Sequence, residues 1–229
     1  MLRLALMIAV SLLGAAQAGA RLPLIDHLVP SWEGFEIELR PLLEKKLLIT
    51  PANCGRMIRM HEHSDQGAIG ESVVSVYCTE AGCHVALTRA AKNLSHLWAD
   101  HREERNQAAL IRSVPVSRKD AAIPESTARA FRECLRAAIR AARKPREESI
   151  VMDNDRVEFW LIERGSAPLK AERPDGAGKN VERLISIGDE LGRYCEMPAL
   201  RRPEAAKHIE QGALRLRNVF ATKHASNHL

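Results

Sequence analysis

The chain has 229 residues, of which 34 are Lys or Arg and 29 are Asp or Glu, so its formal net charge is +5. This length is typical of one domain or of two small ones. The basic excess is modest, its charges are interspersed with acids, and only 4% of the residues are aromatic, so the sequence lacks the dense basic runs of a nucleic-acid-binding surface.

The first 20 residues, MLRLALMIAVSLLGAAQAGA, have the pattern of a secretory signal peptide. Arg3 precedes an apolar run from Leu4 to Ala16, and small-x-small patterns then predict cleavage after Ala18 or Ala20. The run is shorter than the roughly 20 residues that span a bilayer, which disfavours the alternative of an uncleaved anchor. We therefore expect a periplasmic or secreted protein without a membrane span after cleavage.

In chain order, the hydrophobic periodicities first predict a partly helical segment at 42–49, a strand at 54–63 and a hairpin at 71–90. A helix or an extended excursion at 93–111 and a long helix at 126–143 follow. The last predicted elements are a hairpin at 149–162 that turns at 153–155, a second helix at 180–195 and a basic, loosely attached helical tail at 201–229. The sum is an α+β fold, in which an antiparallel sheet of several strands packs against two main amphipathic helices, plus a C-terminal helix. Residues 21–200 would form a single domain, and two similar sub-structures sharing one sheet are the alternative.

The pair Cys78 and Cys83 lies at the facing ends of two predicted strands, ESVVSVYC and CHVALT. Four residues separate the two cysteines, and Gly82 among them suits a tight turn. Such a hairpin would place the two cysteines opposite each other, at the separation that a disulfide needs. Because an oxidising compartment favours disulfides, we predict a Cys78–Cys83 bridge, with free thiols as the alternative.

Three cysteines remain. Cys134 and Cys195 fall on the apolar stripes of the two predicted helices, so both should be buried. They could form a bridge or remain two separate thiols that act as small hydrophobic side chains. Cys54 would stay unpaired or would join Cys78 or Cys83 instead.

His61 and His63 form the candidate metal site. Residues two apart on a strand face the same side, and His84 on a nearby strand could supply a third imidazole. Three histidines with an open position would suit zinc or copper. Solvated residues at the end of a strand are the alternative interpretation.

Trp160 alternates with Phe159 along its predicted strand and therefore points away from the predicted core. It would either anchor a partner or be covered by the N-terminal segment.

No sequence motif for a catalytic nucleophile or a cofactor loop is present, so no catalytic residue and no cofactor is predicted. We expect a non-catalytic binding or interaction protein of the cell envelope, with an envelope protein or polymer as its partner and no nucleic acid. The alternative is a metal-binding envelope protein or a metal-dependent hydrolase that uses the His-x-His motif.

Overall fold

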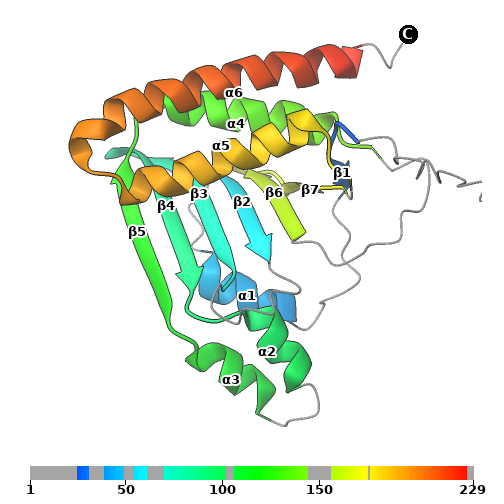
Figure 1. Ribbon diagram of the computed structural model, residues 1–229, viewed down its shortest axis with the longest axis vertical. Helices are drawn as coiled ribbons and strands as arrows, with labels where there is room; N and C mark the ends of the chain where they lie inside the picture. The colour runs from blue at the N-terminus through cyan, green and yellow to red at the C-terminus, as the bar shows by residue number, and fades with distance from the viewer. Residues whose placement is uncertain are drawn as a thin grey trace, which may run out of the picture.

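A seven-stranded antiparallel sheet forms the centre of the computed structural model, with strand order β1-β7-β6-β2-β3-β4-β5. The structure describes residues 25–30, 39–48, 54–60, 70–101, 106–143, 156–174 and 176–225, the side chains of 223–225 excepted. The strands are β1 (Val29–Pro30), β2 (Cys54–Met60), β3 (Ser72–Thr79), β4 (Gly82–Ala90), β5 (Val116–Ala122), β6 (Arg156–Ile162) and β7 (Leu169–Glu172). Helices cover both faces of the sheet (Figure 1), so the predicted α+β class is confirmed.

The helices form two groups. On one face of the sheet lie α4 (Glu125–Arg140) and α5 (Lys179–Glu196), and α6 (Arg202–Ala225) packs across both of them. On the opposite face lie α1 (Leu39–Leu47), α2 (Leu94–Asp100) and α3 (Gln107–Ser113). The short 3-10 helix η1 (Ala199–Arg201) belongs to the first group, where it joins α5 to α6.

The β3–β4 hairpin is tighter than the sequence predicts. Cys78 pairs with Cys83, and the ladder continues to the pair of Thr79 and Gly82, so two residues form the turn instead of four. The Thr79 hydroxyl accepts a hydrogen bond from the Ala81 amide and donates one to the Gly82 carbonyl. Gly82 has a φ of 121°, which an L side chain rarely adopts, and this explains why glycine ends the turn.

The main core lies between the sheet and the helices α4, α5 and α6. Alternate strand residues point into it, among them Met57, Val74, Val85 and Phe159, while α4 and α5 contribute the apolar stripes that the sequence predicts. Gly188 allows α5 to approach the sheet closely, because a Cβ atom there would lie 2.3 Å from the Met57 sulfur.

The helix α6 is an integral part of this core. The sequence predicts a loosely attached tail beyond residue 201, yet α6 buries five side chains against α4 and α5. These are Ala206, Ile209, Ala213, Leu216 and Phe220. The apolar pattern in the sequence of α6 is weak, because this helix contacts only the outer surfaces of α4 and α5. A narrow apolar stripe is sufficient for that contact.

The sequence does not identify the strand β5, and the first arm of the predicted hairpin at 149–162 lies outside the described residues. The residues that form β5 read as a connection to the long helix, because VSRKDAA is polar and only Ala121 of this edge strand enters the main core. The predicted hairpin at 149–162 turns within a segment outside the described residues, and β6 pairs instead with β2 and with β7, on the far side of a loop at 163–168.

Candidate functional site

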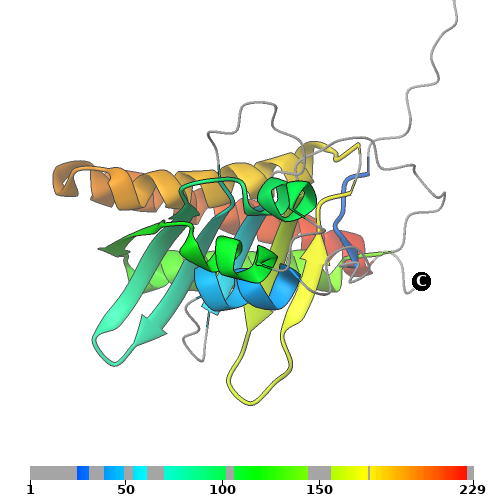
Figure 2. The same ribbon diagram turned by 90° about the horizontal axis from the view of Figure 1, so that it is seen from below.

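The two faces of the sheet differ in polarity. The face toward α4 and α5 is mostly apolar, whereas the opposite face carries polar and charged side chains on six of its strands. They include Arg118 and Asp120 on β5, His84 on β4, Tyr77 on β3, Arg56 on β2, Arg156 and Glu158 on β6, and Lys170 and Glu172 on β7. The helices α1, α2 and α3 cover one part of this polar face, while the β3–β4 and β6–β7 hairpins extend past them (Figure 2).

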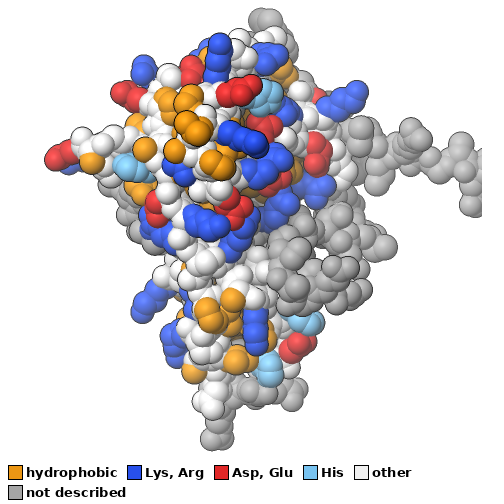
Figure 3. Space-filling model, turned by 60° about the vertical axis from the view of Figure 1, so that its left-hand side comes forward, with side chains coloured by type: hydrophobic (Ala, Val, Ile, Leu, Met, Phe, Trp, Pro, Cys, Tyr) orange, Lys and Arg blue, Asp and Glu red, His pale blue; other side chains and the backbone are white. Residues whose placement is uncertain are grey.

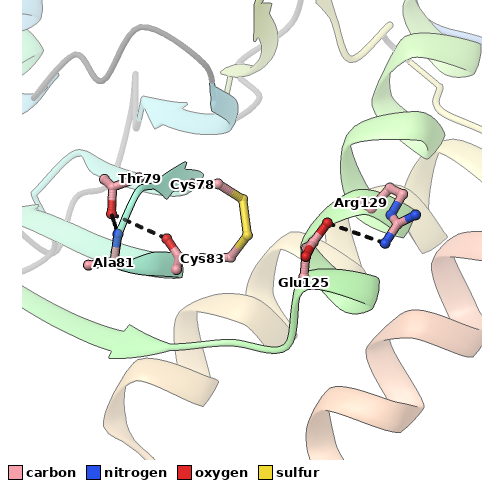
Figure 4. The surroundings of a disulfide bond; sticks show 7 residues. Cys78, Thr79, Ala81, Cys83, Glu125 and Arg129 are labelled. Atoms are coloured by element: carbon pink, nitrogen blue, oxygen red, sulfur yellow. Dashed lines mark hydrogen bonds and ion pairs between the residues drawn. A yellow bond between two sulfur atoms is a disulfide. The ribbon is translucent and has the colours of Figure 1, made fainter.

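Tyr77 and His84 lie opposite each other near the end of the β3–β4 hairpin. Their rings stack with centroids 5.5 Å apart and an interplanar angle of 22°, and both side chains are half-buried. The next pair along the ladder is the disulfide Cys78–Cys83, with a Cα–Cα distance of 4.0 Å. The disulfide lies on the side of the hairpin that faces the start of α4 (Figure 4). Because successive strand residues face opposite sides, the two rings point away from α4.

The neighbouring strand β5 adds Arg118 and Asp120. The Arg118 guanidinium donates to the Asp120 carboxylate through Nε at 2.6 Å and Nη2 at 2.7 Å, and Nη2 also donates to the Tyr77 hydroxyl at 3.2 Å. Tyr77 in turn donates to Asp120 at 2.9 Å. We refer to Tyr77, His84, Arg118 and Asp120 as the Tyr77 cluster.

The electrostatics of the Tyr77 cluster follow from these contacts. Hydrogen bonds from Arg118 hold the pKa of the Asp120 carboxyl below its usual range, although partial burial opposes this effect. Burial, followed by the hydrogen bond to Asp120, raises the pKa of Tyr77 above its usual value. The cluster is therefore an ionised Arg–Asp pair beside a neutral phenol and an imidazole, and it offers hydrogen bonds and aromatic surface to a partner.

A second group of charges lies beneath α1. The Glu158 side chain is 1% exposed and forms ion pairs with Arg40 at 2.7 Å and Arg156 at 3.0 Å. Its other oxygen accepts the indole N–H of Trp160 at 2.8 Å. Arg156 also pairs with Glu172 at 2.9 Å, so the buried charges are compensated.

A cavity of about 30 Å³ adjoins Glu158 and Trp160. Apolar side chains, among them Leu43, Ile58 and Val73, form most of the remaining wall, and Arg40 and Glu44 of α1 complete it. This volume is sufficient for a water molecule or two but not for a larger ligand.

The structure answers the question of cysteine pairing. Cys78 and Cys83 form a disulfide, whereas Cys54, Cys134 and Cys195 are free and buried. The predicted Cys134–Cys195 bridge does not form, because Cys134 lies on α4 toward α6 and Arg217, whereas the Cys195 thiol donates to the Val85 carbonyl of β4. The alternative of two separate buried thiols describes these residues.

The alternative partners of Cys54 are also not used. Cys54 pairs with Tyr77 across β2 and β3 and therefore faces the polar side, opposite to the Cys78–Cys83 disulfide. Burial raises the pKa of the Cys54 thiol, and the positive charges of Arg56 and Arg132 lower it in part.

Of the three predicted metal ligands, the structure places only His84, which stacks on Tyr77. His61 and His63 lie outside the described residues, and those that are described contain no group of three potential metal ligands. The zinc or copper site remains a prediction.

Trp160 is 4% exposed and packs with the side chains of α1. The Lys170 ammonium lies 4.0 Å from the centre of its ring. Of the two roles that the sequence allows, this position matches cover by the N-terminal segment, and a direct contact with a partner would require α1 to move.

Sequence reasoning missed Arg118, Asp120 and Tyr77. The signal available for Tyr77 was its position beside Cys78 on the hairpin, because residues flanking a cross-strand pair must also face each other. Arg118 and Asp120 could not be found, because the strand that carries them was not recognised.

The exposed charges agree with the mixed pattern of the sequence. On the face seen in Figure 3, acidic side chains lie among basic ones and around several hydrophobic ones. Within the part of the chain that the structure describes, no helix combines the length and the hydropathy needed to cross a membrane.

Comparison with known proteins gives no relative from which a function could be transferred. No protein-family model, no curated protein and no solved structure matches the chain.

Proposed function

We propose that the chain is an exported binding protein of the cell envelope that contacts a polar partner through the Tyr77 cluster. The observation that carries the proposal is the adjacency of the Cys78–Cys83 disulfide to the Tyr77–His84 pair. A disulfide persists in an oxidising compartment, which agrees with the signal-peptide pattern of residues 1–20.

The disulfide also has a positional role in this proposal. It joins the two strands one residue beyond Tyr77 and His84, so it fixes the end of the hairpin from which both rings project. Arg118 and Asp120 are exposed beside them. Tyrosine and arginine are among the residue types enriched at the positions that contribute most to binding at protein interfaces, and a rigid pair of rings loses little entropy on binding.

Export is tested by purifying the protein from the periplasm and the medium of expressing cells. N-terminal sequencing should find a chain that begins at Gly19 or Arg21, and peptide mapping without reductant should find a Cys78–Cys83 cross-link. An intact N-terminus on cytosolic protein with a reduced pair would contradict the proposal.

Binding is tested by capture of envelope components on the immobilised mature protein. We expect Tyr77→Ala combined with Arg118→Ala to abolish the capture of a component that the wild type retains. The control is Lys207→Ala, which removes an exposed charge from α6 and should leave capture unchanged. Equal recovery by all three proteins would exclude the Tyr77 cluster as the contact surface.

A further inference from the structure

A groove runs between α4 and α6, on the opposite side of the main core from the Tyr77 cluster. These two helices pack against each other along much of their length (Figure 1). The groove has a volume of about 310 Å³. Its lining consists of Glu133, Arg136, Ala137, Arg140, Arg217 and Ala221.

The lining carries more positive than negative charge. Its three arginines face one acid, Glu133, which pairs with Arg217 at 2.6 Å. Arg136 pairs with Glu163, which lies outside the lining. Arg140 is exposed in the last turn of α4, and no carboxylate of the described residues lies within ion-pair distance of it.

The spacing on α4 concentrates this charge. Arg132, Arg136 and Arg140 follow one another at intervals of four residues, so they are neighbours along one side of the helix. Like charges at this spacing repel one another, and Glu163 is the acid they share. The hydrogen bond from Arg136, followed by the charges of Arg136, Arg132 and Arg140, keeps the pKa of Glu163 below its usual range.

We infer that this groove binds a phosphate group, with Arg136 and Arg140 as its principal ligands and Arg217 on the opposite wall. The planar guanidinium can donate two parallel hydrogen bonds to phosphate oxygens, and the Arg136 pair with Glu163 uses only one of its nitrogens. The small side chains of Ala137 and Ala221 leave the space between the arginines open. The inference is independent of the Tyr77 cluster and adds a second binding site.

The test is titration calorimetry of the mature protein with sodium pyrophosphate, together with co-sedimentation with phosphatidylglycerol vesicles and with phosphatidylcholine vesicles. Arg140→Gln should weaken binding about tenfold, as expected for the loss of a charge-assisted hydrogen bond. Ala221→Leu should weaken it similarly by filling the groove without changing the charge. The control is Arg215→Gln, which removes an exposed arginine of α6 that does not line the groove and should change binding less than twofold.

The outcomes separate the sources of the phosphate. Binding of pyrophosphate that both groove variants weaken supports a soluble phosphorylated ligand. Binding to phosphatidylglycerol vesicles alone, with the same dependence on the variants, supports a lipid headgroup. The inference would be overturned if the protein bound neither probe. It would also be overturned if Arg215→Gln weakened binding as much as Arg140→Gln while Ala221→Leu had no effect, because that pattern describes attraction by net charge.

Discussion

The Glu158 carboxylate accepts the indole N–H of Trp160, two residues along the same strand, at 2.8 Å. Residues at this spacing point to the same face of a sheet, so the acid and the aromatic ring are buried together beneath α1. Arg40 on α1 completes the contact by pairing with Glu158. The polar pair therefore attaches α1 to the sheet, in addition to the apolar contacts of that helix.

Replacing Glu158 by alanine should lower the free energy of unfolding by about 3 kcal/mol, because Arg156 and Arg40 would lose their buried partner. Urea denaturation followed by circular dichroism measures this change. The exposed Glu80 of the hairpin turn is the matched control, and Glu80→Ala should change stability by less than about 0.5 kcal/mol. Similar values for the two variants would show that the ion pairs contribute nothing net.

Trp160 illustrates the limit of strand periodicity. The alternation with Phe159 correctly predicts that the two rings face opposite sides of the sheet. It cannot tell whether the second side is open or covered, because the cover comes from α1, more than one hundred residues earlier in the chain. Local patterns predict the orientation of a side chain, and only the tertiary fold determines its exposure.

The Cys78–Cys83 disulfide should stabilise the protein by about 2 kcal/mol, the value expected for closing a short loop. Reductant should therefore lower the urea midpoint of the wild type. The double variant Cys78→Ser/Cys83→Ser should start at the lower midpoint and not respond to reductant. A wild type that is indifferent to reductant would mean that the bridge makes no contribution.

The three free thiols should resist alkylation in the native protein. Burial raises the pKa of Cys134 to about 12 and that of Cys195 to about 11, so little reactive thiolate exists near neutral pH. Mass spectrometry after iodoacetamide treatment should find no adduct on the native chain, three in denaturant and five in denaturant with reductant. Alkylation of native Cys134 as fast as in denaturant would contradict the burial of this residue.

The same shifts define the pH dependence of stability. A raised pKa in the folded state means that the thiols favour folding below their ordinary pKa of 9.0, and this contribution is lost as the pH rises through 11 to 12.

Asp120 should behave in the opposite way. Its pKa is lowered in the folded state, chiefly by hydrogen bonds from Arg118, so its contribution to stability is present above the ordinary value of 3.8 and is lost as the pH falls through the folded pKa. The side chain is 39% exposed, so solvent screening limits this contribution to less than about 1 kcal/mol. In an NMR titration, Arg118→Gln should move the Asp120 pKa upward, and an unchanged pKa would show that the pair does not persist in solution.

The sequence predicts the class of the fold and the disulfide because both depend on short-range patterns. The β-branched run of β3 and its continuation in β4 indicate a hairpin, and the two cysteines at its end determine the pairing. The Tyr77 cluster depends on β5, a polar edge strand whose register with β4 brings Asp120 and Arg118 beside Tyr77. A charged edge strand has little apolar alternation, so its sequence resembles that of a loop.

The attachment of α6 is tested by two adjacent residues of that helix. Phe220 is fully buried against the core, whereas Val219 is 37% exposed. Phe220→Ala should lower the free energy of unfolding by about 3 to 4 kcal/mol, because it leaves a cavity in a packed interior. Val219→Ala should change it by less than about 0.5 kcal/mol, as expected for a surface position. Urea denaturation gives both free energies of unfolding. Small and nearly equal effects of the two substitutions would mean that α6 is attached as loosely as the sequence alone predicts, because a helix that detaches before the core unfolds contributes little to global stability.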